Sequence, residues 1–449
     1  MIKINQNKGF ALVYTLIFLY LIVSFVTIYM FCIANGSAAA TRSANEIEAY
    51  YVADMGLVDA YQRITQAGIN TIPSTSSFIP SPSTDNGICS VGTGTGNYSV
   101  SLIYSNSPRT TYTITSAGTF GGVTKTLQLK IIGASVSKYA YWSNTEDSPI
   151  YGDLWWMTGM ITTGPVQTNG SLNVYGNPIF DGPVTQAGPS IDYYPGSGSD
   201  PNQIFTDGLT LSSPEVNLPA QATLNAIYNV ANDGLGLVLT GASTVIFNPD
   251  GTITVTGTVT NSQGIVTTTY NNTTIQPPTN GVVYVQSTPG QQDGNVTVQG
   301  TVSGQLTVAA DQNIYVSGSI AYNKDPRDPG NSNSTDMVGL VSNNNITIIS
   351  ATAPASLEMS GVFVALQGSF QVDNYWVPGK GNMDQFGSLV NNYCGPTGVF
   401  DPSTGILYGG WNQIQSYDAR LATFAPPGFP PYVSNSGSAV YTKIGFSEL

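Results

Sequence analysis

The pattern of hydrophobic and polar positions first separates the N-terminal region from the rest of the chain. Residues 10–34 are apolar apart from Tyr, Thr, Ser and Cys side chains, and no charge follows Lys8 before Arg42. At about 1.5 Å per residue, a helix of this length crosses a hydrocarbon core of roughly 30 Å. A cleaved secretory signal has an apolar region of only about 7–15 residues. We therefore predict a membrane-spanning helix with residues 1–9 on the cytoplasmic side.

The helical pattern continues beyond the apolar run. No proline occurs before Pro73, and Gly68 marks the helix end because glycine is favoured just past a helix C-terminus. One helix is predicted from about residue 10 to about residue 67, on the order of 85 Å long. Its second half is apolar on one side only. The predicted stripe comprises Ile47, Tyr50, Tyr51, Leu57, Val58, Tyr61 and Ile64.

Alternating strands follow this helix. Residues 71–87 are rich in Ser, Pro and Thr, which predicts a loop. Alternating runs at 98–104, 111–116 and 123–132 are separated by Asn-Ser-Pro and Gly-Gly turns. We expect a small antiparallel sheet that packs on the second half of the helix, in a unit spanning residues 35–133.

The remaining residues, 134–449, show another pattern. Short alternating strands are separated by turns rich in Gly, Asn and Asp, without a helical segment. Between residues 295 and 318 the apolar pairs recur every eight to ten residues. A large all-β domain is predicted, giving an α+β chain overall. Very short strands and Asn/Gly-rich turns favour a right-handed β-helix or solenoid, and a β-sandwich is the alternative. The apolar pairs are Val296/Val298, Leu306/Val308 and Ile314/Val316.

The tail of the chain has its own signals. Residues 416–422 predict a short helix that Pro426 ends. Two Pro-Pro pairs then predict an extended segment. We interpret this tail as a cap over the end of the solenoid, with a partner-docking peptide as the alternative.

Composition narrows the range of functions. Charged residues make up 9% of the chain, against a usual level of about 25%, and the net charge is −13. An acidic chain without a Lys/Arg cluster repels phosphate, so we expect no nucleic-acid partner. The chain contains no histidine, which excludes Ser-His-Asp and Cys-His nucleophile systems and His-ligated zinc.

The cysteines leave two alternatives open. Cys32 lies in the apolar run. Cys89 and Cys394 could form a disulfide outside the cytosol or remain two free thiols, because nothing in the sequence places them together.

Three acidic residues are weak candidates for a calcium site. Asp325, Asp328 and Asp336 lie in a loop rich in oxygen donors. Their spacing does not match the calcium-loop motif, and Lys324 and Arg327 add opposing charge. A solvated loop is favoured, and we predict no metal or cofactor.

Two further groups of residues could act on or bind carbohydrate. The adjacent acids Glu146 and Asp147, with Asp153 and Asp181 further along, could serve glycoside cleavage, but solvated turns are the favoured reading and we predict no enzyme. The tryptophans could form a sugar-stacking surface, although core packing is the commoner role. They are Trp142, Trp155, Trp156, Trp376 and Trp411.

The junction Lys8-Gly9-Phe10 and the helix behind it resemble the type IV pilins and pseudopilins. Precursors of that superfamily carry a short basic leader ending in Gly, followed by an apolar helix that begins with Phe. The stretch EAYYVADMGLVDAYQRI is also similar to the early helix of PilX-like minor pilins. The resemblance covers about the first seventy residues. It implies cleavage by a prepilin peptidase between Gly9 and Phe10, N-methylation of Phe10, and helix packing with other pilin subunits.

One position departs from the pattern of the major pilins. Those proteins carry Glu as the fifth residue of the mature chain, where this chain has Tyr14. A buried carboxylate in an apolar setting is costly and serves to pair with a partner charge. The resemblance therefore implies a minor subunit at or near a filament tip.

These observations predict a minor, tip-located subunit that primes pilus assembly and adheres to a surface glycan or protein. The precursor is expected to cross the inner membrane once and later to reach the pilus on the cell surface. Residues 134–449 are too bulky to repeat along a thin filament wall. A type II secretion pseudopilin at a pseudopilus tip and a membrane-anchored β-helix enzyme acting on polysaccharides remain the alternatives.

Overall fold

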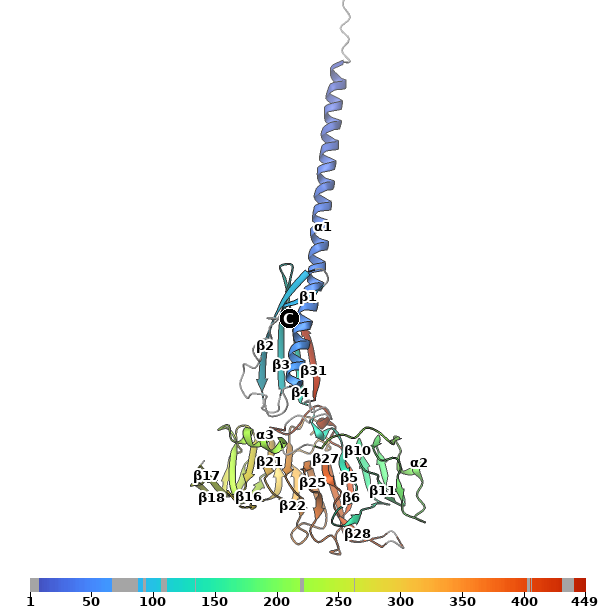
Figure 1. Cartoon of the computed structure of the whole chain (residues 1–449), viewed down its shortest axis with the longest axis vertical. Helices are drawn as coiled ribbons and strands as arrows, with labels where there is room; N and C mark the ends of the chain where they lie inside the picture. The colour runs from blue at the N-terminus through green and yellow to red at the C-terminus, as the bar shows by residue number, and fades with distance from the viewer. Residues whose placement is uncertain are drawn as a thin grey trace, which may run out of the picture.

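The computed structural model shows a long helix, a small sheet and a large β domain, one after another along the longest axis (Figure 1). We refer to the small sheet with the helix half packed on it as the head, and to the large β domain as the body. The structure describes residues 8–66, 88–91, 94–105, 111–133, 135–218, 222–261, 263–401, 404, 406–429 and 440–449. The loop predicted at 71–87 and the helix end predicted at Gly68 lie outside these residues.

The N-terminal helix is continuous, as the sequence predicts. Helix α1 spans Lys8–Gln66, and its second half packs on the head sheet. All strand pairs in this sheet are antiparallel. The strands lie in the order β1 (Ile88–Val91), β2 (Gly94–Ser105), β3 (Thr111–Phe120), β4 (Val123–Gly133) and β31 (Tyr441–Glu448).

Strand β31 corrects the predicted boundary between the head and the body. It comes from the end of the chain and pairs along β4, so that Tyr441 lies opposite Gly133. Without it, β4 would present an edge of unpaired backbone groups. More than 300 residues separate the two strands in sequence, and alternation alone does not reveal a partner so far away. The head therefore consists of residues within 35–133 together with β31.

The body is built from stacked parallel strands. One ladder runs through ten strands, each parallel to the next. In spatial order these are β16 (Leu237–Phe247), β19 (Val282–Gln286), β21 (Gln305–Ala310), β23 (Met337–Ser342), β25 (Leu357–Ala365), β27 (Asn382–Tyr393), β5 (Tyr141–Thr145), β10 (Val166–Thr168), β13 (Val184–Gln186) and β15 (Leu209–Thr210).

Further parallel ladders run beside the first one and enclose a common hydrophobic core with it. The predicted apolar pairs, such as Val296/Val298, are buried in this core. The second ladder continues from β16 through β20 (Val296–Val302), β22 (Ile314–Tyr322), β24 (Ile346–Ile348) and β26 (Phe370–Val372), and the third continues from β27 through β30 (Asn412–Ser416), β9 (Ile161–Thr163) and β12 (Ile179–Asp181). A short parallel sheet contains β8 (Trp156–Met157), β11 (Asn173–Tyr175) and β14 (Asp192–Tyr193).

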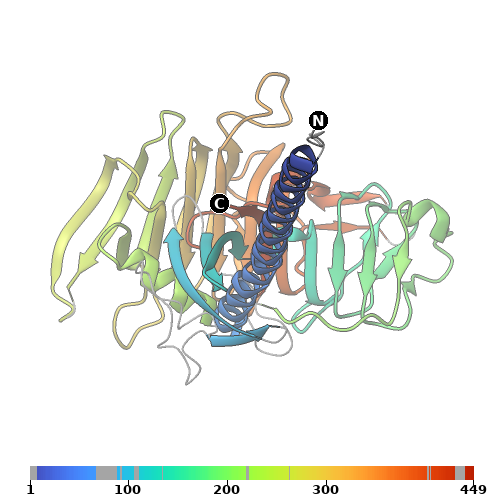
Figure 2. The ribbon, with the colours of Figure 1, turned by 90° about the horizontal axis from the view of Figure 1, so that it is seen from above.

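The chain threads the body from its middle. Strand β5 enters beside β27, and the following strands run out to one end near α2 (Pro201–Ile204). The chain then crosses to the other end, where β16 pairs with the hairpin of β17 (Ile253–Thr260) and β18 (Val266–Ile275). From there it returns strand by strand to the middle, where β30 pairs with β9. Figure 2 shows the body extending to both sides of α1. The strands from β5 to β15 form one arm of the body, and those from β16 to β30 form the other. The two arms meet at β27–β5 and β30–β9, and we call this meeting the seam.

A helix that the sequence analysis missed covers one flank of the body. Helix α3 (Ala222–Ala231) packs on β19 and β21. Its buried side chains Leu224, Ile227 and Ala231 follow a helical spacing of three and four. That spacing was present in the sequence but was masked by the surrounding strand pattern. The second buried cluster of the body lies under this helix.

The tail crosses the same flank and does not cap an end of the ladder, which corrects the predicted position. The short 3₁₀ helix η2 (Ala419–Ala422) lies within the predicted helix at 416–422. Beyond it, Thr307 Oγ1 donates a hydrogen bond of 2.6 Å to the carbonyl oxygen of Pro427. Phe429 is buried against Gly339 of β23. The second Pro-Pro pair, Pro430-Pro431, lies outside the described residues.

The remaining short elements complete the body. The 3₁₀ helix η1 (Val136–Lys138) joins the head to β5. Two small hairpins consist of β6 (Asp147–Ser148) with β7 (Gly152–Asp153), and β28 (Gly398–Phe400) with β29 (Leu407–Gly410). Figure 1 places β28 at the end of the molecule opposite to the start of α1.

Candidate functional site

The first half of α1 stands free of the rest of the molecule. It contains the one helical segment of the described residues that is long and apolar enough to span a membrane, and its most hydrophobic stretch is wholly unburied. Gly9 and Phe10, the predicted cleavage junction, lie in the first turn of this helix. Phe10 and Tyr14 are each 68% exposed. This part of the chain is therefore ready to bury apolar surface against a bilayer or another helix.

The second half of α1 packs closely on the head sheet through small residues. Ala49, Val52 and Ala53 are fully buried. A Cβ at Gly118 of β3 would collide with the backbone of Ala53, so only glycine allows this approach. On the helix side, a Cβ at Gly56 would collide with Ser116. The stretch AYYVADMGL, which carries the pilin resemblance, thus supplies the small residues of this contact.

The predicted apolar stripe is divided between two faces of α1. Leu57 and Ile64 face the sheet and are buried, as predicted. Three other large apolar side chains are exposed, which corrects the prediction of one core-facing stripe. Together with Met55 they follow steps of four, four and three, so they share one outer face. This outer stripe consists of Ile47, Tyr51, Met55 and Val58.

A groove lies between α1 and the last strand of the head. Its volume is about 370 Å³, and Val58, Tyr61 and Phe446 are among its lining residues. The ammonium group of Lys443 lies over the Tyr61 ring, 5.3 Å from its centroid. The groove adjoins the outer stripe at Val58 and extends the apolar surface of the helix onto β31.

The three candidate calcium ligands do not converge. Asp325 binds Arg327, and Asp336 accepts hydrogen bonds from the backbone nitrogens of Gly304 and Lys324 at 2.7 and 2.8 Å. Burial raises the pKa of Asp325, but the Arg327 hydrogen bonds outweigh this and leave it below its ordinary value. No group of three His, Cys, Asp or Glu side chains is placed to hold a metal within the part of the chain that the structure describes.

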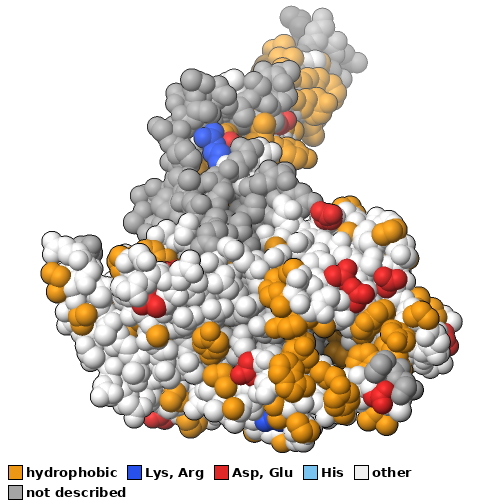
Figure 3. Space-filling view, turned by 60° about the horizontal axis from the view of Figure 1, so that its bottom comes forward, with side chains coloured by type: hydrophobic (Ala, Val, Ile, Leu, Met, Phe, Trp, Pro, Cys, Tyr) orange, Lys and Arg blue, Asp and Glu red, His pale blue; other side chains and the backbone are white. Residues whose placement is uncertain are grey.

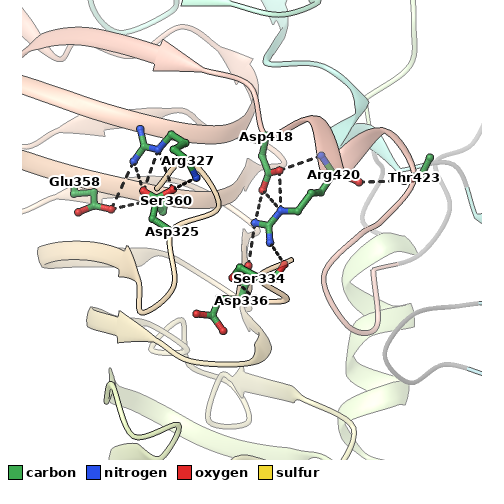
Figure 4. Close-up of polar contacts among 9 residues, drawn as sticks. All are labelled: Asp325, Arg327, Ser334, Asp336, Glu358, Ser360, Asp418, Arg420 and Thr423. Atoms are coloured by element: carbon green, nitrogen blue, oxygen red, sulfur yellow. Dashed lines mark hydrogen bonds and ion pairs between the residues drawn. The ribbon is translucent and has the colours of Figure 1, made fainter. Parts of the chain in front are cut away.

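Two arginines fasten the loop that carries these aspartates (Figure 4). Arg327 also binds Asp384 of β27, at 2.9 Å. Arg420 of η2 binds Asp418 at 2.6 Å and donates to the carbonyl oxygen of Ser334 at 2.7 Å. The loop is therefore tied to the middle of the body and to the tail, which is a structural role for its charges.

Glu146 is buried, although the sequence analysis favoured a solvated turn. Its carboxylate accepts hydrogen bonds from Ser143 Oγ and from Trp156 Nε1, the latter at 3.0 Å. Burial raises the pKa of Glu146, and these hydrogen bonds oppose the rise. Asp147 is exposed and binds the Asn173 amide at 2.9 Å. Glu146 follows β5 directly, and alternation along that strand groups it with the exposed Asn144 rather than with Ser143, which it contacts.

The tryptophans gather around one cavity at the seam. This seam cavity, of about 220 Å³, is lined by Trp155, Trp156 and Trp411, which come from both arms of the chain. Trp376 is 56% exposed, and its ring lies 4.9 Å from that of Tyr375, another lining residue. Trp142 is buried in the other cluster, on the flank of the body. The structure thus brings together four of the five predicted aromatics.

The cysteines are placed in different parts of the molecule. Cys394 lines the seam cavity and is a free thiol. Burial raises its pKa far above the ordinary thiol value. Cys89 lies on β1 of the head, and its side chain is outside the described residues. Cys32 is a free, exposed thiol on the first half of α1. The disulfide between Cys89 and Cys394 stays a prediction without structural support.

The chain is similar to one family model and to a solved pilin structure. A domain of unknown function, DUF4900, matches residues 104–189, which run from β2 through the head sheet into the first strands of the body. No curated protein matches the chain. Among solved structures, the chain is similar to the competence-associated pilin ComZ from Thermus thermophilus, with 12% identity and a TM-score of 0.31. That match covers 90% of this chain and 97% of the other, and at this TM-score it carries no argument for function.

Proposed function

We propose that the chain is a minor type IV pilin-like subunit, placed at or near a filament tip, where it primes assembly and adheres to a surface. The observation that carries the proposal is α1: its first half is apolar and unburied, and its second half is fixed to the head. A helix held in this way can leave the bilayer and exchange lipid for the apolar helices of other subunits.

The outer stripe supports contacts beyond the membrane segment. Ile47 is 57% exposed and lies some 13 residues past the end of the apolar run, beside the head. Large apolar patches on a surface are typical of interaction sites. In the proposed filament, this stripe and the adjoining groove at Phe446 pack on neighbouring subunits.

The shape of the body supports a tip position. It extends to both sides of α1 and so lies across the helix axis (Figure 2). Copies stacked along a thin filament wall would collide, whereas one copy at the end meets no neighbour above it. Tyr14 supports the same position, because a subunit without the buried Glu has no carboxylate to pair with a following chain.

For the body itself we propose a right-handed β-helix in preference to a β-sandwich. Sandwich sheets are antiparallel, whereas the ladders of the body are parallel over most of their length. Right-handed connections are strongly favoured between parallel strands of one sheet. Stacked asparagines at successive turns add support: Asn313 Nδ2 donates to Asn295 Oδ1 at 3.1 Å, and Asn313 Oδ1 accepts from Asn345 N at 3.2 Å.

We also propose that the chain is not an enzyme. Glycoside cleavage uses two carboxyl groups that flank the scissile bond. Among the described residues, one carboxylate lines the seam cavity, that of Asp153, and the carboxylate of Glu146 is held by Ser143 and Trp156. An assay on neutral and acidic polysaccharides tests this proposal, and turnover that is lost in Glu146→Gln would contradict it.

The proposed function is tested by the mature N-terminus and the location of the protein. Mass spectrometry of the chain from its producing cell should find Phe10 as the first residue, with a methylated amine, in the sheared filament fraction. Gly9→Val should leave the precursor uncut in the membrane, while Gly36→Ala, which meets nothing within 4 Å, should be processed normally. An intact Met1, or cleavage beyond residue 34, would falsify the proposal.

Cross-linking in the same cells separates a pilus from a secretion pseudopilus. A photoreactive residue at Tyr51 of the outer stripe should capture pilus subunits. Capture of secretion-machine proteins instead would assign the chain to a type II secretion pseudopilus.

A further inference from the structure

The seam cavity has walls of aromatic rings held in place by hydrogen bonds. Trp411 Nε1 donates to the carbonyl oxygens of Pro354 and Ala355 at 3.2 and 3.0 Å, and the Lys380 ammonium lies 4.7 Å from its ring centroid. Trp156 is fixed by Glu146 and meets Tyr141 edge-on at 5.0 Å. Rings that are already ordered cost little further entropy when a ligand stacks on them.

Two half-buried rings lie nearer to solvent. Trp155 packs edge-on against Tyr194 at 5.3 Å, and Tyr375 lies between Tyr151 and Trp376, at 5.6 and 4.9 Å. Phe400 of β28 lines the same cavity, β28 lies at the end of the molecule away from the start of α1 (Figure 1), and hydrophobic side chains gather on that side of the body (Figure 3). The cavity therefore opens where a tip subunit would meet a surface.

Three amide side chains line the cavity among the rings, and in each of them only the oxygen or only the nitrogen forms hydrogen bonds within the described chain. Asn391 Oδ1 accepts from Phe370 N at 2.8 Å, Gln413 Nε2 donates to Gln385 Oε1 at 2.8 Å, and Asn412 Nδ2 donates to Gly159 O at 3.0 Å. Within the described chain, no protein group bonds to the Asn391 amide nitrogen or to the carbonyl oxygens of Gln413 and Asn412. The lining thus keeps one donor and two acceptors for a ligand.

The charge of the lining restricts the ligand. Asp153 is its carboxylate, no Lys or Arg lines the described cavity, and the whole chain is acidic. An anionic ligand would be repelled. A lipid tail or an apolar peptide side chain would bury the amides without pairing them, which costs free energy.

We propose that the seam cavity binds the end of a neutral saccharide. A sugar ring has an apolar C–H face that stacks on an aromatic ring, and its hydroxyl groups both donate and accept, as this set of amides and Asp153 requires. The volume of about 220 Å³ lies below the roughly 300–1,000 Å³ of pockets for drug-sized ligands, so one or two sugar rings fill it. The inference deepens the adhesive part of the proposed function and rests on it.

The test uses the full chain in detergent micelles. An array of neutral, sulfated and sialylated glycans should show binding to neutral members, and titration calorimetry with neutral hexasaccharides such as cellohexaose, chitohexaose and maltohexaose should follow. Trp155→Ala and Tyr375→Ala should each weaken binding about tenfold or more, because each removes a stacking surface. Tyr375→Phe should bind as the wild type does, since it keeps the ring.

Phe424→Ala serves as the matched control, because Phe424 is an exposed aromatic on the tail, away from the cavity. Unchanged melting temperatures of the variants exclude unfolding as the cause of lost binding. A preference for charged glycans or apolar peptides, an absence of neutral-glycan binding, or wild-type affinity in both alanine variants would overturn the inference.

The filament assay separates this inference from the proposed function. If Trp155→Ala still reaches the filament fraction but no longer binds the glycan, both proposals are supported. A wild-type chain that is found in filaments and binds no neutral glycan overturns the saccharide site alone. A chain that binds the glycan and keeps its uncut Met1 overturns the pilin role alone.

Discussion

The head and the body each include a strand from a distant part of the chain, but they depend on it differently. In the head, β2, β3 and β4 are sequence neighbours joined by short connections, and β31 is added at one edge. In the body, β5 joins β27 in the middle of a ladder, so the common core is complete only when this distant contact has formed. In the head, β2, β3 and β4 can pair through local contacts, and β31 is added to them. The body exists as one unit only after both arms have met. Contacts between residues far apart in sequence form slowly because the loop must first be closed.

The largest expected effect breaks the head. Gly118→Val places a side chain against backbone atoms of Ala49 and Ala53 in α1, which cannot turn aside as a flexible side chain would, and should cost about 4 kcal/mol or more of stability. Protease should then cut at the second half of α1 in micelles, where the wild type is protected. Gly36→Ala, on the exposed part of the same helix, should leave the protection unchanged. Equal resistance of both variants would show that α1 and the head are not packed as described.

The next effect breaks the seam. Leu389 lies on β27, is buried, and pairs with Tyr141 of β5. Leu389→Ala should cost about 3 kcal/mol, because it leaves a cavity between the two arms. Hydrogen exchange should rise in both arms at once while the head stays protected. Ile150→Ala, at an exposed site, is the control, and exchange confined to one arm would show that the arms fold separately.

A smaller effect concerns the pH dependence of the body. Burial raises the pKa of Glu146 above its ordinary value of 4.5. In the pH range between the ordinary pKa and the raised pKa of the folded state, the folded chain therefore binds more protons than the unfolded chain. Stability therefore falls as the pH rises through this window and levels off above it. Urea unfolding at several pH values should show that Glu146→Gln removes this fall. A slope that is unchanged in the variant would assign it to another group.

The smallest effect is expected at the edge of the head. Lys125 and Glu448 join β4 and β31 by an ion pair of 2.6 Å between partly exposed side chains. Lys125→Ala should leave the unfolding midpoint within experimental error, because such surface pairs contribute little. A clear loss of stability would mean that β31 is held by its charge rather than by its backbone pairing.

Local patterns predicted the elements of the head well. The predicted helix and the runs at 98–104, 111–116 and 123–132 correspond to α1, β2, β3 and β4. In these elements the period of the apolar residues reflects the conformation directly. The stripe of α1 was predicted on one face, whereas the structure divides it between two, because the Ala and Gly residues that contact the sheet give a weaker hydrophobic signal than the exposed Ile47 and Tyr51.

The arrangement of the body was less accessible to sequence analysis. Alternation shows which residues of a strand face inward, but it does not name the neighbouring strand. The pairing of β5 with β27, the burial of Glu146 and the gathering of Trp155, Trp156 and Trp411 all depend on the order in which strands stack. The individual tryptophans were recognised as candidates, whereas their shared cavity follows from the seam.

The two strands that connect the head to the body also decide how the molecule carries a load. The chain leaves the head at the end of β4 and returns to it at the start of β31, and Gly133 and Tyr441 lie opposite each other. A body pulled by a bound surface draws on both strands at the same end and in the same direction. The tension is divided between the two connections, and β4 and β31 are pulled together rather than away from each other. A pull on the body would thus reach the head through a double connection.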